Sequence, residues 1–292
     1  MQTPIQGPLV SVVIASYNHA PYIEASIKSV LQQTYTNIEL LVVDDGSRDD
    51  SVERILRLQA EYGFDFRPQE NRGLSRTLNE TIARARGVLI APLGSDDIML
   101  PDRLAKQVAY LEGKPEVGIC AGNVQEIDET GKPLKTPKIL PKRRLDFADI
   151  FLDRKPGAPA PTLLFRREAL EQVGGFDSEI RLEDLLIALK ITHSGYYLDI
   201  LPDVLAQYRV HPTNTYKNYR FMTENILKSY AKFSDHPAYP EVCARFRNSM
   251  LLKCARTDRE LAWSLLRDIP AEYWNGKTFR SLLRLLRSYL PG

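Results

Sequence analysis

The first strong structural signal in the chain is the apolar run LVSVVIA at residues 9–15, which the polar stretch SYN at residues 16–18 ends. The run is rich in β-branched residues and almost continuous, which is typical of a strand buried on both faces of a parallel sheet. Two more runs of this kind follow, IELLVV at 38–43 and VLIAPL at 88–93, and each ends in a polar cluster. We therefore expect an α/β fold with a mostly parallel sheet.

Segments with helical periodicity separate the apolar runs, at about residues 22–31, 50–62, 74–86, 101–111 and 183–194. Shorter strand-like segments lie at 64–67, 117–124, 162–165 and 197–200. Strands that alternate with helices of this length predict right-handed crossovers between parallel strands. The pattern is that of a sheet flanked by helices.

Two regions depart from this alternation. Residues 130–161 hold six prolines, and we interpret them as a long loop with one short helix near 145–152. After residue 215 the strand signals stop and the chain is helical in pattern. We therefore expect an α/β domain at 1–215 and a C-terminal helical region at 216–292.

Composition and charge limit the classes of protein to which the chain can belong. The chain has 292 residues, of which 43% are hydrophobic and 26% charged, enough apolar material for a sizeable core. Its net charge of +2 excludes a polybasic protein that binds nucleic acid. The near-neutral total hides a split, because residues 216–292 hold 14 Lys and Arg against 7 Asp and Glu, and residues 1–215 hold 25 against 30. We expect an acidic first domain and a basic helical tail.

Cysteine and hydropathy patterns indicate the compartment. Three cysteines without a CxxC pair exclude a disulfide scaffold. We find no secretory signal, and no apolar run approaches the roughly 20 residues that a membrane span needs. These features predict a cytoplasmic protein, either soluble or attached at the inner face of the cytoplasmic membrane.

Polar clusters follow the predicted strands, with DDGS at residues 44–47 and GSDD at 94–97. Ligands of parallel α/β sheets bind beyond the carboxyl ends of the strands, so both carboxylate pairs should meet at one edge. A divalent cation bound to a nucleoside diphosphate would relieve their repulsion. The alternative for each cluster taken alone is a turn and helix cap.

Several segments together resemble glycosyltransferase family 2 on a GT-A fold. They are SVVIASYN at 11–18, VVDDGS at 42–47, NRG at 71–73, SDD at 95–97, GGFD at 174–177, LED at 182–184 and YRVH at 208–211. The resemblance covers about residues 8–215. It implies transfer of a sugar from a nucleotide-sugar donor with inversion at the anomeric carbon, by a metal-assisted mechanism.

The resemblance implies that one group of residues binds the nucleotide sugar: Ala15, Ser16, Tyr17, Asp44, Asp45, Asn71, Gly73, Arg76, Ser95, Asp96 and Arg209. Within it, Asp44 would hydrogen-bond the base and Asp45 would orient the loop. A second group would hold the divalent cation, Mn²⁺ or Mg²⁺: Asp96, Asp97 and His211. Glu183 and Asp184 would be the catalytic residues at the acceptor face, with Asp184 as general base.

The chain departs from the family pattern near these residues. Gly94 stands where the first Asp of the usual Asp-x-Asp motif would be, which leaves fewer carboxylates for the metal. The usual arginine is replaced by Leu78, and Arg76 is a candidate substitute. We interpret His19 as a structural or surface residue.

The acceptor side is less defined by the sequence. The Gln-x-x-Arg-Trp motif and the membrane spans of processive synthases are absent, so we expect addition of a single sugar. The resemblance implies a glycan or lipid-linked glycan acceptor in lipopolysaccharide core, O-antigen or capsule assembly, and a dTDP- or UDP-sugar donor, with dTDP-rhamnose favoured. The alternatives are a non-catalytic nucleotide-sugar-binding subunit and a nucleotidyltransferase, although the latter's N-terminal glycine-rich phosphate loop is not seen.

The C-terminal segment 278–290 has an amphipathic helical pattern. One face carries Phe279, Leu282, Leu283, Leu286 and Leu290, and another carries Arg280, Arg284 and Arg287. A basic amphipathic helix is typical of a peripheral membrane contact. The alternative is that its apolar face packs on the catalytic domain.

Overall fold

The computed structural model describes residues 7–212 and 214–287. The described chain divides into two compact units. The first unit holds residues 7–150 and 154–211, and the second holds 151–153, 212 and 214–287. The two units are described separately below.

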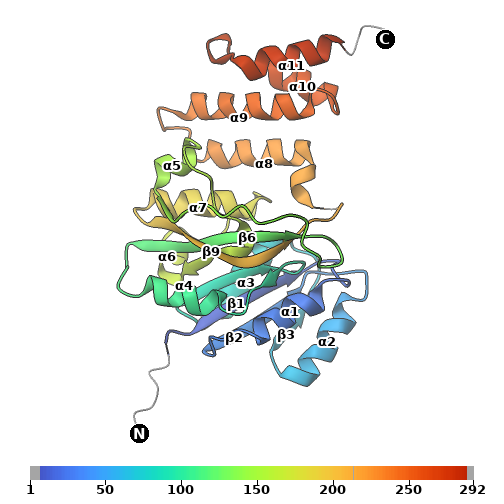
Figure 1. The fold of residues 1–292 in the computed structure, drawn as a ribbon, viewed down its shortest axis with the longest axis vertical. Coiled ribbons are helices and arrows are strands. Elements are labelled where there is room, and N and C mark those ends of the chain that lie inside the picture. Colours follow the sequence, from blue (N-terminus) through green and yellow to red (C-terminus); the bar gives the residue numbers. More distant parts are fainter. Residues whose placement is uncertain (1–6, 213, 288–292) are drawn as a thin grey trace. The chain divides into compact units, whose positions relative to one another are not determined.

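The first unit alternates strands and helices along the chain (Figure 1). Its strands are β1 (Val10–Ser16), β2 (Ile38–Asp44), β3 (Asp65–Pro68), β4 (Leu89–Gly94), β5 (Ile98–Met99), β6 (Val117–Ile127), β7 (Arg143–Leu145), β8 (Leu164–Arg166) and β9 (Tyr197–Arg209). Its helices are α1 (Ile23–Leu31), α2 (Ser51–Tyr62), α3 (Leu74–Arg84), α4 (Arg103–Leu111), α5 (Phe147–Phe151, the end of which belongs to the second unit), α6 (Arg167–Gln172) and α7 (Glu183–His193).

All nine strands form one sheet, in the order β3-β2-β1-β4-β8-β6-β9-β5, with β7 paired to β9. Neighbours β3, β2, β1 and β4 are parallel, and so are β6 and β9. The short strand β8 is antiparallel to both β4 and β6. The strands β1, β2, β3, β4, β6 and β9 therefore all point the same way, which confirms the prediction of a mostly parallel sheet.

The sheet is buried on both faces, as its continuous apolar strands predict. In β1, Val12 and Ile14 lie in one core with residues of α1, α2 and α4. Val13 points to the opposite core, which contains residues of α3, α6 and α7. This alternation places three helices on each face, because successive side chains of a strand point to opposite sides.

The sequence pattern stopped the last strand too early. We expected a strand at 197–200, and β9 continues to Arg209 across Pro202. The pairing of β6 with β9 shifts register between Ala121 and Asn123, which is where Pro202 falls on the opposite strand. Irregular positions of this kind accommodate proline, which cannot donate to a regular ladder. The extension is important because it delivers Arg209 and His211 to the edge of the sheet.

The second unit is helical. It contains α8 (Tyr219–Ala231), α9 (Tyr239–Cys254), α10 (Arg259–Arg267) and α11 (Gly276–Arg287), and α9 contacts the other three (Figure 1, orange to red). Its own core includes Leu251, Ala262 and Leu285. Within the described residues, no helix is long and apolar enough to span a membrane.

Candidate active site at the carboxyl edge of the sheet

The carboxyl ends of the parallel strands bring the predicted polar clusters to one edge. β1 ends at Ser16, β2 at Asp44, β4 at Gly94 and β9 at Arg209. The chain runs from β1 outward to β2 and β3 and then returns to place β4 on the other side of β1. This reversal creates the crevice in which ligands of open α/β sheets bind. The crevice lies between the residues after β1 and those after β4.

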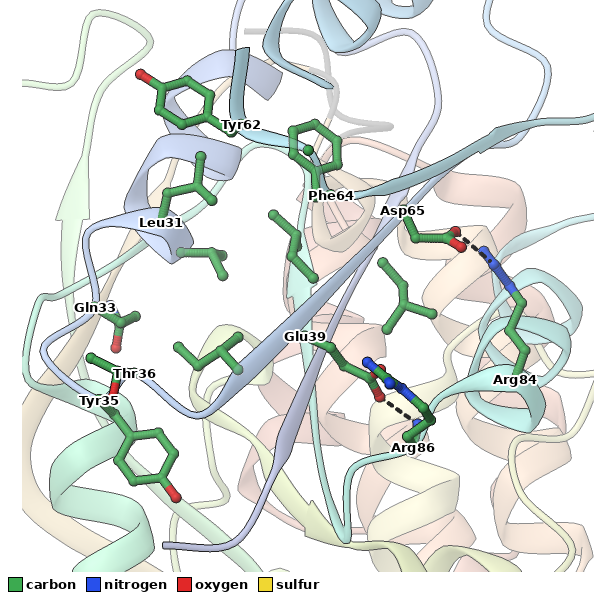
Figure 2. Close-up of a pocket in the computed structure, with 15 residues that line it drawn as sticks. Leu31, Gln33, Tyr35, Thr36, Glu39, Tyr62, Phe64, Asp65, Arg84 and Arg86 are labelled. Atoms are coloured by element: carbon green, nitrogen blue, oxygen red, sulfur yellow. Dashed lines mark hydrogen bonds and ion pairs between the residues drawn. The ribbon is translucent and has the colours of Figure 1, made fainter. Parts of the chain in front are cut away.

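A cavity of about 590 Å³ lies at the opposite edge (Figure 2). It is lined by the beginnings of β2 and β3, and its charged side chains pair with each other. Arg86 lies 2.9 Å from Glu39, and Arg84 lies 3.0 Å from Asp65. Because it is far along the strands from the polar clusters, we treat this cavity as structural.

The turn after β2 is stabilised by Asp44, a predicted nucleotide-binding residue that is 1% exposed. Its carboxylate accepts hydrogen bonds from the backbone N–H of Ser47 at 2.8 Å and from the Ser47 hydroxyl at 2.6 Å. Ser47 Oγ in turn accepts from the backbone N–H of Asn18 at 2.8 Å. This joins the loop after β1 to the loop after β2, so Asp44 organises the crevice wall.

Asp45 holds the segment between β3 and α3. Its carboxylate accepts from the Gln69 amide, the backbone N–H groups of Arg72 and Gly73, and the Thr77 hydroxyl, all within 2.9 Å. Asp45 is 4% exposed, so these four bonds are made away from solvent. The geometry agrees with the loop-orienting role that the resemblance implies.

Asp96 and Asp97 follow β4 and are close to each other. Asp97 is 5% exposed and accepts from the backbone N–H of Arg209 at 2.9 Å. Burial, and then the negative charge of Asp96, raise the pKa of the Asp97 carboxyl well above its usual range. Such a site is more stable when a cation neutralises it.

Three side chains from different loops converge at this point: His19, Asp96 and His211. One possible ligand atom of each lies within 4.8 Å of the others. His211 Nε2 lies 2.9 Å from Asp96 Oδ2, and His19 Nδ1 lies 2.7 Å from the hydroxyl of Ser95. Ser95 therefore orients the His19 ring, as second partners of metal-binding histidines commonly do. We call these three residues the His-Asp-His cluster.

Aromatic contacts fix the orientation of the cluster. The Tyr22 ring stacks on His211 with centroids 5.4 Å apart and an interplanar angle of 24°. The Arg209 guanidinium lies over the same Tyr22 ring, 4.8 Å from its centroid. Arg209 also donates from Nε to the Asp96 carbonyl oxygen at 2.8 Å, and from a terminal nitrogen to the carbonyls of Asp128 and Glu129. Arg209 thereby ties the ends of β4, β6 and β9 together.

The donor set of the His-Asp-His cluster fits a divalent cation. Two imidazoles and a carboxylate suit a transition metal such as Mn²⁺ better than Mg²⁺, which prefers oxygen ligands. Burial lowers the pKa of His19, which keeps its imidazole neutral, the form that binds metal. The predicted ligands Asp96 and His211 belong to the cluster, and Asp97 lies beside it.

The predicted catalytic residues Glu183 and Asp184 begin α7, at the same edge of the sheet. Asp184 Oδ1 accepts from the backbone N–H of Leu185 at 2.7 Å. The preceding segment is tied to α3, because the Ser75 hydroxyl donates to the Ile180 carbonyl at 3.0 Å. Burial and the neighbouring Asp184 raise the pKa of Glu183 to about 8, and burial also raises the pKa of Asp184.

The other predicted binding residues lie around the crevice with different exposure. Ser16 is fully buried at the end of β1, and its hydroxyl has no hydrogen-bond partner among the described residues. Tyr17 is 44% exposed beside it, and Ala15 is half-buried. The exposed residues Asn71 and Gly73 lie in the loop that Asp45 holds.

Arg76 lies apart from the other predicted residues. Its side chain is 58% exposed and pairs with Glu80 at 2.9 Å on the surface of α3. Leu78, where the family has an arginine, packs in the core. The described contacts therefore do not join Arg76 to the His-Asp-His cluster.

Sequence reasoning missed His19 and Tyr22. We interpreted His19 as structural or superficial, yet it lies in the cluster. The available signal was its place just after β1, at the edge where Asp44 and Asp96 also lie. Tyr22 could not be found in this way, because its contact with His211 depends on where β9 ends.

The fold is that of the GT-A class, which the solved structures reported below share. The chain matches Glycosyl transferase family 2 over residues 11–174. It belongs to this family. AmsE of Erwinia amylovora, an amylovoran biosynthesis glycosyltransferase, is 32% identical to it over 203 residues, which cover 68% of this chain and 75% of AmsE.

Solved structures have the same fold. TarS 1–349 of S. aureus, in complex with UDP-GlcNAc, is similar with a TM-score of 0.68 and 15% identity, over 96% of this chain and 89% of that one. A longer TarS structure is covered over 54% of its length. The mannosyltransferase PcManGT of Pyrobaculum calidifontis, in complex with GDP-Man and Mn²⁺, has a TM-score of 0.63 at 20% identity, over 99% of this chain and 92% of that one.

Proposed function

We propose that the protein transfers one sugar from a nucleoside-diphosphate sugar to a hydroxyl group of a glycan or lipid-linked glycan, with inversion at the anomeric carbon. The observation that carries the proposal is the His-Asp-His cluster at the crevice between β1 and β4, with the carboxyls of Glu183 and Asp184 at the same edge. A cation site and a separate pair of carboxyls are what this reaction needs.

Asp184 acts as the general base in this reaction. The acceptor oxygen forms a bond to the anomeric carbon while the bond from that carbon to the diphosphate oxygen breaks, and the acceptor proton passes to the Asp184 carboxylate. The nucleoside diphosphate leaves with the bonding electron pair. No covalent sugar–enzyme intermediate is needed. Glu183 lies beside Asp184, and burial together with the charge of Asp184 raises the pKa of the Glu183 carboxyl.

His19, Asp96 and His211 would hold the divalent cation, with Asp97 beside them. When bound, the cation stabilises the negative charge that develops on the diphosphate of the leaving group. Two imidazole donors lead us to propose Mn²⁺ rather than Mg²⁺. The Mn²⁺ in the structure of PcManGT supports this choice.

The nucleotide lies along the loops after β1 and β2 in this proposal. The buried Ser16 hydroxyl lacks a partner among the described residues and is available to a ligand in the crevice. The exposed ring of Tyr17 can stack on a base. The complexes of TarS with UDP-GlcNAc and of PcManGT with GDP-Man support a nucleotide-sugar donor. They do not choose among sugars, so dTDP-rhamnose stays a prediction.

We place the reaction in the assembly of a bacterial polysaccharide, at the inner face of the cytoplasmic membrane. The similarity to AmsE, an amylovoran biosynthesis glycosyltransferase, supports a role in polysaccharide assembly. The proposed acceptor is a glycan or lipid-linked glycan, so the test includes lipopolysaccharide core, O-antigen and capsule acceptors.

A donor screen tests the proposal. The full chain is incubated with dTDP-rhamnose, UDP-hexoses, UDP-N-acetylhexosamines and GDP-mannose, with and without Mn²⁺, and with candidate glycan acceptors. We expect release of one nucleoside diphosphate that depends on both the acceptor and Mn²⁺. Binding of a nucleotide sugar without any turnover would instead favour the non-catalytic subunit.

Substitution of Asp184 tests the assignment of the base. Asp184→Asn should lower kcat about 10²–10⁴-fold, because the hydroxyl proton then has no acceptor. The KM for the donor should change little. Glu168→Gln, an exposed carboxyl on α6, is the matched control and should keep full activity. Full turnover by Asp184→Asn would refute the assignment.

A further inference from the structure

The last helix of the second unit exposes a row of large apolar side chains. Phe279 is 56% exposed, Leu283 57% and Leu286 54%, and the nearby Trp274 is 39% exposed. Trp274 and Phe279 contact each other edge to face, with centroids 6.0 Å apart. We call these four residues the apolar strip. Leu290, which the sequence places on the same face, lies outside the described residues.

The apolar strip does not hold α11 in place. The helix packs on α9 through Leu285, Thr278 and Ser281, each 0% exposed. Polar bonds reinforce this contact. The Thr278 hydroxyl donates to Asn248, and Lys277 donates to the Ser249 hydroxyl at 2.8 Å. The strip is therefore surplus to the packing of this unit, and an exposed apolar patch of this kind indicates a binding surface.

The charges of α11 show what kind of surface would bind it. The helix contains four basic residues and no acidic residue: Lys277, Arg280, Arg284 and Arg287. At 100° per residue, positions 280 and 287 follow directly beside the strip on the side away from Leu285. Lys277 and Arg284 lie farther round the helix and hydrogen-bond to α9, at the Ser249 hydroxyl and the Leu252 carbonyl, each at 2.8 Å. An apolar row containing Trp and Phe, bordered by cationic positions, matches the boundary between acyl chains and anionic headgroups.

We propose that the apolar strip inserts into the surface of an anionic lipid bilayer, with α11 parallel to the membrane plane. The strip enters the acyl region, and Arg280 beside it meets the headgroups. This proposal deepens the proposed function, because it brings the enzyme to the surface where a lipid-linked acceptor would lie. The binding itself does not depend on sugar transfer.

Vesicle binding of the full chain tests the proposal. Sedimentation with phosphatidylcholine vesicles that contain phosphatidylglycerol should recover the protein, and pure phosphatidylcholine should recover much less. Phe279→Ser combined with Leu283→Ser should weaken the partition constant at least about tenfold. Arg280→Gln should lower the partition constant about fivefold. Added salt should lower it too.

A matched control separates the strip from general hydrophobicity. Leu56→Ser on α2 changes an apolar side chain that is 48% exposed in the first unit, and it should leave vesicle binding unchanged. Circular dichroism and thermal unfolding should be the same for all variants, because the strip contributes little to packing. Equal loss of binding in Leu56→Ser would overturn the proposal.

Tryptophan fluorescence gives a second, independent measurement. The chain has two tryptophans, and Trp263→Phe leaves Trp274 as the reporter. We expect a blue shift of its emission with anionic vesicles, and quenching by lipids brominated on the acyl chain. An unshifted and unquenched Trp274 would contradict insertion.

Two other outcomes count against the proposal. If light scattering shows dimers that the Phe279→Ser, Leu283→Ser variant converts to monomers while vesicle binding is unchanged, the strip is a contact between copies. If neither vesicles nor self-association respond to the variant, the strip is not a membrane contact. Sugar transfer to a soluble acceptor fragment is measured in parallel with vesicle binding. If transfer occurs but vesicles are not bound, the membrane proposal fails and the proposed enzymatic function stands.

Discussion

Gly94 lies two residues before Asp96, and a Cβ atom on it would lie 2.8 Å from both Asp96 Oδ1 and Asp97 Oδ2. The two carboxylates occupy the space that a side chain at position 94 would need. This explains in physical terms why the chain does not carry the first Asp of the family motif. In the proposed cation site, the imidazoles of His19 and His211 take the place of the missing carboxylate.

Restoring the family residue should therefore harm the site. We expect Gly94→Asp to weaken Mn²⁺ binding about 10–100-fold, because the new side chain displaces Asp96 and Asp97. Electron paramagnetic resonance of Mn²⁺ titrated with the protein measures this without any substrate. Gly157→Asp is the control, because a Cβ there meets no atom within 4 Å. Tighter Mn²⁺ binding by Gly94→Asp would show that the explanation is wrong.

The pH dependence of activity should reveal the pair Glu183 and Asp184. The pKa of Glu183 is raised from its ordinary 4.5 to about 8, and the pKa of Asp184 is raised as well. The base, Asp184, works only when deprotonated, so the acid limb of kcat/KM should lie at higher pH than the ordinary range of an aspartate carboxyl. A second inflection near 8, if the profile shows one, belongs to Glu183 and should disappear in Glu183→Gln while the acid limb of Asp184 stays. An inflection near 8 that persists in Glu183→Gln would contradict this assignment.

The same pair should affect stability with a definite sign. Because the folded-state pKa lies above the ordinary value, the folded protein binds more protons than the unfolded chain between about pH 4.5 and 8. The pair's contribution to the free energy of unfolding is therefore present below pH 4.5 and is lost as pH rises towards 8. Melting temperatures of wild type and Glu183→Gln, measured over this pH range, test this. As pH rises, the melting temperature of the wild type should fall relative to that of the variant.

At the scale of elements, loops between strands and helices are held by single polar side chains that each make several hydrogen bonds to the backbone. Asp45 is the strongest example, since one side chain accepts four hydrogen bonds from the segment that leads into α3. Gly175 and Asn79 give a second example. Asn79 exchanges two bonds with the backbone of Phe176, and a Cβ on Gly175 would lie 2.6 Å from Asn79 Oδ1. These contacts fix the loops on either side of the crevice.

Replacing Asp45 should loosen its loop. Asp45→Asn turns one acceptor oxygen into a donor, which leaves buried N–H groups unpaired and should cost about 1–3 kcal/mol of unfolding free energy. Urea unfolding measures the loss, and faster hydrogen exchange at Arg72 and Gly73 would localise it. Asp65→Asn, which breaks an exposed pair with Arg84, is the control and should cost less than about 1 kcal/mol. Equal costs for the two variants would rule out this role of Asp45.

The elements also show what the sequence could predict. The continuous apolar strands and the periodic helices were predicted well, because their patterns come from burial on two faces. Strand β9 was predicted only to residue 200, because Pro202 ends an ordinary strand pattern and the irregular pairing that tolerates it is a property of β6. Strand β7 was missed inside the proline-rich loop for a similar reason, since its pairing partner is far away in the chain.

Of the site, the residues at the ends of β1, β2 and β4 could be expected from position and resemblance. The role of His19 could not, because convergence with His211 requires the end of β9. A pattern over a few neighbouring residues carries no information about contacts between residues as far apart in the chain as His19 and His211.

At the scale of the whole molecule, the chain passes between its two units three times. Residues 151–153 leave the first unit and belong to the second. There Phe151 is fully buried, with ring centroids 5.7 Å from Tyr230 and 5.0 Å from His236. From the sequence we expected a single boundary, at residue 215. The segment 151–153 was not predicted to belong to the second unit, because so short a segment leaves no pattern in the sequence.

Phe151 should therefore stabilise the second unit although it lies in the middle of the chain. Phe151→Ala should lower the unfolding free energy of this unit by about 3–5 kcal/mol. Both tryptophans, Trp263 and Trp274, belong to the second unit, so fluorescence during urea unfolding reports on it directly. Phe151→Leu, which keeps most of the volume, should lose much less. An unchanged fluorescence midpoint in Phe151→Ala would contradict the assignment of this segment.

The polar attachment of α11 has a consequence for how such enzymes diversify. Because Thr278, Lys277 and Leu285 dock the helix, the exposed row at Phe279, Leu283 and Leu286 can be exchanged without cost to the fold. Drift at these three positions would change where the enzyme works and leave its chemistry intact. A lineage could thus move from membrane-bound to dissolved acceptors by point substitutions on one helix, long before its nucleotide-sugar pocket changed.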